Sequence, residues 1–92
     1  MNSLSDLELL RDYVARRSEA AFAELVRRHV DLVYSAALRM ANNSHMAEDV
    51  SQKVFLALAQ SARELTNRTV ISGWLHRTTQ NIAATANRKW LR

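Results

Sequence analysis

The sequence has no cysteine and no proline, and it contains a single glycine, Gly73. The lack of cysteine excludes a disulfide framework, a thiolate metal site and a cysteine nucleophile. With so little proline and glycine there are few residues for tight turns, and the 48% of hydrophobic residues favour helices over strands because many are alanine and leucine. The composition therefore predicts an all-α domain with one small core.

Long apolar runs are also missing. No segment approaches the length of a membrane span, and the N-terminus MNSLSDLELL lacks the basic start and apolar run of a signal peptide. We therefore expect a cytoplasmic protein.

Residues arranged for catalysis or metal binding are equally scarce. A single glycine cannot form a phosphate-binding loop, and no local motif joins a serine to a histidine and an aspartate. His45 and Asp49 share a helical face, but two ligands without a third make a weak metal site. His29 falls within an apolar stripe, where we expect a hydrogen-bonded core residue. The sequence predicts no enzyme, no metal site and no cofactor.

Acidic residues are absent after Glu64. Residues 1–49 hold six basic and eight acidic side chains, whereas residues 50–92 hold seven basic and one acidic. A basic C-terminal half predicts a polyanionic partner such as nucleic acid, although by composition alone a solvated cationic face is as good an interpretation.

Apolar spacing and capping residues predict four helices. Ser5 and Glu8 form a capping-box pattern, and we expect Ser18, Ser44 and Ser72 to cap the three later helices. The predicted elements are a first helix within 1–17, a second over 18–41, a third over 44–62, a polar loop over 63–72 and a fourth helix over 72–92. Together they predict a compact four-helix bundle with a polar loop before the last helix.

The third predicted helix carries a leucine in the middle of its polar face. At 100° per residue, its core-facing stripe consists of Ala47, Val50, Val54 and Leu58. Leu56 points away from that stripe. Its neighbours on the polar face are Asp49, Gln52, Lys53 and Gln60. A stray exposed leucine is common on protein surfaces, so the position alone decides nothing.

The last predicted helix has a buried and a basic face. The buried face is expected to hold Leu75, Ile82, Ala86 and Trp90, with Thr79 and Ala83 beside them. The opposite face presents Arg77, Asn81, Ala84 and Arg88, flanked by Trp74, Thr78 and Thr85. Arginine suits phosphates, and asparagine and threonine suit base edges or sugars. Trp74 fits equally well as a stacking surface for a base or as a residue that closes the core.

The polar loop before this helix favours single-stranded over duplex DNA. It contains Arg63, Asn67, Arg68 and Thr69, which can form a pocket for an extruded base. A helix-turn-helix reader of duplex DNA would have a shorter turn before its recognition helix.

Three stretches, in order, resemble region 2 of bacterial RNA polymerase sigma factors of the extracytoplasmic-function type. Residues 21–40, AFAELVRRHVDLVYSAALRM, resemble the family's A-F-x-x-L opening. Residues 47–59, AEDVSQKVFLALA, resemble its A-E-D-x-x-Q-x-x-F-L signature. Residues 73–83, GWLHRTTQNIA, resemble its W-L segment with the later asparagine. The resemblance covers nearly the whole chain.

The resemblance implies a role in transcription initiation. In such proteins the third helix docks on the coiled coil of the polymerase beta-prime clamp, and the loop and last helix capture the non-template strand of the −10 promoter element as it melts. The implied polymerase-binding residues are Asp49, Gln52, Lys53, Leu56 and Gln60, with Leu56 as the apolar centre. The implied DNA-binding residues are Arg63, Asn67, Arg68, Thr69, Trp74, Arg77, Thr78, Asn81 and Arg88. An anti-sigma factor is a further candidate partner.

Some residues depart from the family pattern. Lys53 stands where many relatives carry an acidic residue, and Thr78, Thr79 and Gln80 replace an apolar pair and a frequent arginine. These changes bear on clamp pairing and promoter preference rather than on the fold. Nothing in the sequence corresponds to the second helical domain that reads the −35 element, so we expect a domain of a longer protein. Two alternatives stay open, a sigma-like protein-interaction module without DNA binding and a duplex DNA-binding regulator.

Overall fold

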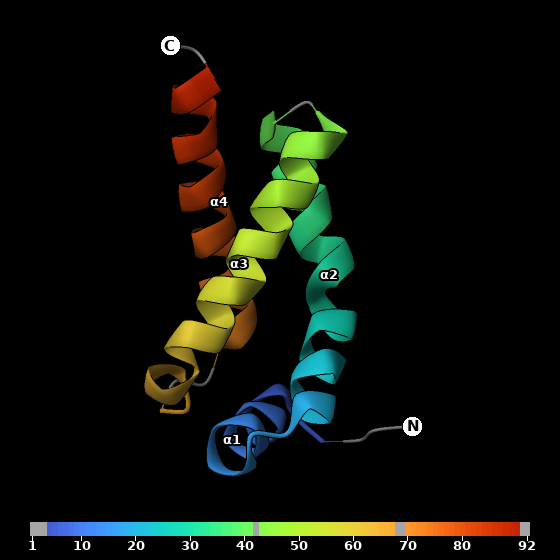
Figure 1. Cartoon of the computed structure of the whole chain (residues 1–92), viewed down its shortest axis with the longest axis vertical. Coiled ribbons are helices and arrows are strands. Elements are labelled where there is room, and N and C mark those ends of the chain that lie inside the picture. The colour runs from blue at the N-terminus through green and yellow to red at the C-terminus, as the bar shows by residue number, and fades with distance from the viewer. Residues whose placement is uncertain (1–3, 42, 68–69, 91–92) are drawn as a thin grey trace.

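The computed structural model describes residues 4–41, 43–67 and 70–90, and within them it contains four helices and no strand (Figure 1). These are α1 (Asp6–Arg16), α2 (Glu19–Ala41), α3 (Ser44–Leu65) and α4 (Ile71–Trp90). The last three helices pack side by side with alternating directions, while α1 lies across the end where α2 begins and α3 finishes. The domain measures 42 × 26 × 19 Å. The predicted all-α bundle is confirmed.

Short polar residues start the first three helices. Ser5 and Glu8 form the predicted capping box, in which the Glu8 N–H donates to Ser5 Oγ and the Ser5 N–H donates to Glu8 Oε1, each at 3.1 Å. Ser18 Oγ accepts from the Ala21 N–H at 3.1 Å, as predicted. The cap of α3 is Asn43 rather than Ser44, because the Asn43 side chain accepts from the Met46 N–H at 3.1 Å.

The loop between α3 and α4 is shorter than the sequence predicts. The predicted limits of 63–72 are wrong, because α3 continues to Leu65 and α4 already begins at Ile71. Ser72 therefore lies inside the first turn of α4 rather than at its cap. Burial of Leu65 and Ile71 explains the difference, since each is at most 3% exposed and fixes the adjoining helix turn to the core. The connection is reduced to residues 66–70.

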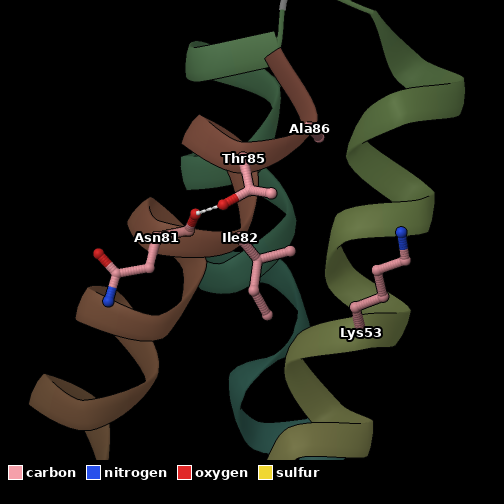
Figure 2. A pocket seen from close by; sticks show the side chains of 5 residues that line it. All are labelled: Lys53, Asn81, Ile82, Thr85 and Ala86. Atoms are coloured by element: carbon pink, nitrogen blue, oxygen red, sulfur yellow. Dashed lines mark hydrogen bonds between the residues drawn. The ribbon is translucent and has the colours of Figure 1, made fainter. Parts of the chain in front are cut away.

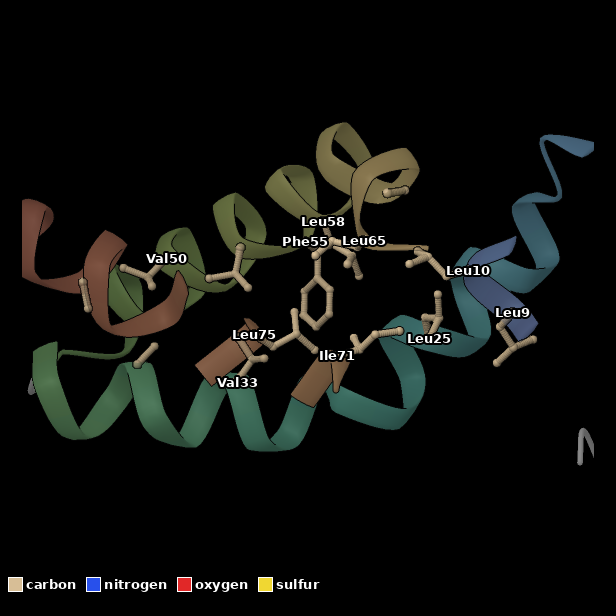
Figure 3. Close-up of a cluster of buried hydrophobic side chains, with 14 of the residues drawn as sticks. Leu9, Leu10, Leu25, Val33, Val50, Phe55, Leu58, Leu65, Ile71 and Leu75 are labelled. Atoms are coloured by element: carbon tan, nitrogen blue, oxygen red, sulfur yellow. The ribbon is translucent and has the colours of Figure 1, made fainter. Parts of the chain in front are cut away.

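The core lies between α2, α3 and α4, and α1 closes one end of it (Figure 3). All four predicted stripe residues of α3 are fully buried. Phe55 adds a ring that points from α3 toward Ile71 and Leu75 of α4. On α4, Leu75 and Ala83 are buried, and Ile82 and Ala86 pack half-buried against the core. The predicted burial of Trp90 falls on a side chain outside the described part of the structure.

Buried polar groups in this core have partners. Thr79 is fully buried on α4, and its hydroxyl donates to the Leu75 carbonyl at 2.7 Å. His29 is half-buried beside the core rather than within it, and its Nε2 lies 2.7 Å from an Asp6 carboxylate oxygen, which confirms the predicted hydrogen bond of this histidine. The other Asp6 oxygen accepts from Arg28 at 3.2 Å, so this polar contact joins α1 to α2.

None of the described helices is long and apolar enough to span a bilayer.

Candidate functional site

The outer face of α3 exposes one large apolar side chain. Leu56 is 57% exposed, whereas Leu58, two residues later on the same helix, is completely buried. The residues around Leu56 on this face are all exposed and polar, namely Asp49, Gln52, Lys53 and Gln60. Asp49 and Lys53 form an ion pair of 3.0 Å. The structure therefore places together all five residues predicted to bind polymerase.

The outer face of α4 presents cations without carboxylates. Arg77, Asn81 and Arg88 are exposed along the helix, as the spacing predicts. Within the described ranges neither arginine forms an ion pair. The Arg88 Nη2 donates instead to Thr85 Oγ1 at 3.3 Å, and this hydroxyl in turn donates to the Asn81 carbonyl at 3.0 Å. Arg88 is thereby held close to the helix surface while its charge stays unneutralised.

Trp74 and Thr78 occupy the inner edge of this face. Trp74 is half-buried and packs against the core cluster, which supports its role in closing the core at the start of α4. Thr78 is half-buried as well. Contact of these two residues with DNA stays a prediction.

A groove lies between the outer faces of α3 and α4, and residues from both helices line it. It has a volume of about 310 Å³ and is lined by Lys53 of α3 and by Asn81, Ile82, Thr85 and Ala86 of α4 (Figure 2). Ile82 points toward α3, while the amide of Asn81 points away from it. Lys53, predicted to bind polymerase, thus lies across the groove from the helix predicted to bind DNA.

The residues predicted for the base-capture loop are only partly in a loop. Asn67 is exposed in the connection, while Arg63 is exposed in the last turn of α3. Arg68 and Thr69 lie outside the described residues. Val70, which the sequence does not single out, is 61% exposed just before α4.

Two residues escaped the sequence reasoning because their contacts are distant in the chain. Asn87 Nδ2 donates to the Met40 carbonyl at 3.1 Å and thereby ties α4 to the end of α2. Arg17 lines a pocket together with Arg63. For Asn87, the only sequence signal of such a contact is its place as a polar residue on the predicted inner half of the last helix. For Arg17 the sequence gives no signal of its contact.

The described residues of these faces contain no cluster of metal-ligating side chains. Among the described residues, no three histidine or acidic side chains group so that they can hold a metal ion, so His45 and Asp49 lack a third ligand.

The ionisable groups whose pKa is shifted lie on α1 and α2. Hydrogen bonds from the backbone and side chain of Ser5 lower the pKa of Glu8, and the Arg28 and Arg27 guanidiniums lower the pKa of Glu24. Hydrogen bonding to Glu24 correspondingly raises the pKa of Arg28.

The chain is similar to proteins of one known family. The family model described as sigma-70 region 2 matches residues 25–90, from the second turn of α2 to the end of α4. The chain belongs to the sigma-70 region 2 family. Sigma factors are transcription initiation factors and not enzymes, so the expectation of a non-enzymatic protein is confirmed.

Relatives with known names support the extracytoplasmic-function type. The chain is 44% identical over 59 residues to the ECF RNA polymerase sigma factor SigE of Mycolicibacterium smegmatis, a match that covers 64% of this chain and 23% of that protein. It is 30% identical over 76 residues to the ECF RNA polymerase sigma factor SigW of Bacillus subtilis, covering 83% of this chain and 41% of SigW. This sigma region 2 domain therefore spans less than half of the length of either relative. No solved structure matches the chain.

Proposed function

We propose that this sigma region 2 domain binds RNA polymerase core through α3 and captures melted promoter DNA through α4. The α3 face would dock on the coiled coil of the beta-prime clamp. The loop and α4 would hold the non-template strand of the −10 element. Such a protein acts in the cytoplasm, where polymerase and promoter DNA are found.

The observation that carries the proposal is the exposure of Leu56. An apolar centre surrounded by polar residues is the usual anatomy of a specific protein–protein contact. Leu56 has this setting, with exposed polar or charged side chains around it. Burying a leucine against a partner stabilises the complex by about 1.5–3 kcal/mol.

The carboxylate-free face of α4 supports the DNA half of the proposal. Arg77 and Arg88 have no acidic partner among the described residues, so their charges are available to phosphates. Each phosphate contact with single-stranded DNA contributes about −0.7 to the slope of log affinity against log salt. Stacking or capture of unpaired bases, at about 1–3 kcal/mol per base, would offset the stacking that the duplex loses on melting.

The proposal is tested by calorimetric titration of the chain with a purified beta-prime clamp coiled coil. We expect Leu56→Asp to abolish binding, because it places a charge at the centre of the interface. The matched control is Leu32→Asp on α2, since Leu32 is 54% exposed but lies on another helix. This control should bind like the wild type, and circular dichroism should show both variants equally helical. Equal binding by both variants, or no binding by the wild type, would refute the proposed role of α3.

A further inference from the structure

A small pocket lies between the ends of α1 and α3, away from the groove of Figure 2. Its volume is about 110 Å³, and it is lined by Tyr13 and Val14 of α1, by Arg17 directly after α1, and by Arg63 in the last turn of α3. Tyr13 is held in place by Phe22, whose ring centre lies 4.8 Å away. The pocket thus combines two guanidinium groups with a fixed aromatic and apolar wall.

Both arginines at this pocket lack a counter-charge. Arg17 and Arg63 are exposed, and neither forms an ion pair with any described residue. The acidic residue of the last α1 turns, Asp12, is paired with Arg16 at 3.7 Å. Two cations that line one small pocket repel each other, and a bound anion removes that repulsion. Guanidinium groups are suited to phosphate because they donate two parallel hydrogen bonds.

The backbone directs Arg17 to this position. Arg17 has φ 54° and ψ 39°, the left-handed conformation, and it is the only non-glycine residue with positive φ among those described. This conformation is unfavourable for a residue with a Cβ. It turns the chain sharply between α1 and the Ser18 cap of α2, and it sets the Arg17 side chain beside the pocket.

The pocket borders the loop that precedes α4. Arg11 of α1 approaches the Thr66 carbonyl at 3.5 Å, so α1 lies against the start of this loop. Arg63 stands one turn before the same loop. The pocket therefore lies close to the start of this loop.

We propose that the pocket of Tyr13, Val14, Arg17 and Arg63 binds a backbone phosphate of the single-stranded DNA that leaves the loop. Arg17 and Arg63 would hold the phosphate, and the Tyr13–Val14 wall would contact the sugar. This inference rests on the proposed function and extends the DNA-binding surface to α1, which lies outside the residues matched by the family model.

The test measures fluorescence anisotropy of the 92-residue chain with labelled oligothymidylates of increasing length, over a range of salt. A phosphate contact is independent of base sequence, so a homopolymer is sufficient. We expect Arg17→Ala and Arg63→Ala each to reduce the magnitude of the log–log salt slope by about 0.7. For a fourfold rise in salt, the wild type then loses about 2.6-fold more affinity than either variant. The loss should be absent on oligonucleotides too short to reach beyond the loop.

Arg16→Ala is the matched control, because it removes the same charge from the neighbouring position. Arg16 is 82% exposed, is paired with Asp12, and lies outside the pocket. Its slope should equal that of the wild type. Arg17→Gly guards against misfolding, since glycine adopts positive φ freely, and it should behave like Arg17→Ala.

The outcomes separate this inference from the proposed function. If Arg77→Ala and Arg88→Ala weaken binding while Arg17→Ala and Arg63→Ala match Arg16→Ala, the pocket proposal is overturned and the α4 proposal stands. If the wild type binds no oligothymidylate, the pocket proposal and the α4 proposal both fail. If Arg17→Ala affects only the binding of a polyglutamate peptide, the pocket serves an acidic protein segment and the DNA proposal is overturned.

Discussion

The outer faces of α3 and α4 expose different kinds of side chain. On α3 the charges of Asp49 and Lys53 neutralise each other, and the apolar side chain of Leu56 is left exposed to water. On α4 the charges of Arg77 and Arg88 are not paired with any described carboxylate. An apolar centre gains from burial against a protein, whereas unpaired cations gain from a polyanion. One small bundle can therefore serve two chemically different partners on adjacent helices.

The largest expected effect separates the two faces of α3 itself. Leu58→Ala should lower the free energy of unfolding by about 2–5 kcal/mol, because it leaves a cavity in a fully packed core. Leu56→Ala should change it by less than about 0.5 kcal/mol, because the side chain is exposed. Urea denaturation followed by circular dichroism measures both. Similar losses for the two variants would show that Leu56 is a structural residue and would remove it from the interface.

A smaller effect distinguishes the two outer faces. Arg77→Ala or Arg88→Ala should each weaken single-stranded DNA binding by roughly tenfold, the cost of one charge-assisted hydrogen bond of about 1.5 kcal/mol. Neither should alter binding to the clamp coiled coil. Anisotropy and calorimetry on the same protein preparations test this pair of expectations. A loss of clamp binding in the α4 variants would mean that the faces are not separate.

Within the α4 face, Asn81 and Arg88 should have different effects. Asn81→Ala should reduce the preference among oligonucleotide sequences, because the exposed amide points away from α3 and can contact base edges. Arg88→Ala should weaken all sequences alike. Equal losses on every sequence for both variants would contradict this division.

The smallest expected effect concerns stability far from both faces. The Glu24 carboxyl has a lowered pKa in the folded protein because it accepts from Arg28 and Arg27. As the pH falls, the unfolded state therefore takes up the Glu24 proton before the folded state does. The stabilisation by Glu24 is complete above the ordinary carboxyl pKa, and it is lost as the pH drops through the lower pKa of the folded state. Glu24→Gln should be less stable than the wild type at neutral pH, and the difference should shrink in acid. Thermal unfolding against pH measures it.

The control for this prediction is Glu48→Gln. Glu48 is exposed on α3 and forms no ion pair with the described residues. Its substitution should leave stability unchanged across the same pH range. A Glu24→Gln difference that stays constant with pH would show that the contribution is not electrostatic.

Periodicity and resemblance together predicted the fold class and the position of Leu56. Leu56 and Leu58 lie far apart on a helical wheel, so a local pattern was enough to separate them. The limits of the loop were missed because the burial of Leu65 and Ile71 depends on helices elsewhere in the chain. The meeting of Arg17 with Arg63 depends on how α1 crosses the bundle. No local pattern records such a crossing, because it follows from tertiary packing.

The central claim is that α3 and α4 bind different partners, and mapping of amide chemical shifts tests it most directly. The chain would be titrated separately with the clamp coiled coil and with a single-stranded oligonucleotide. We predict that the coiled coil perturbs the amides around Leu56, and that the oligonucleotide perturbs those around Arg77, Asn81 and Arg88. The same set of perturbed residues in both titrations would contradict the claim.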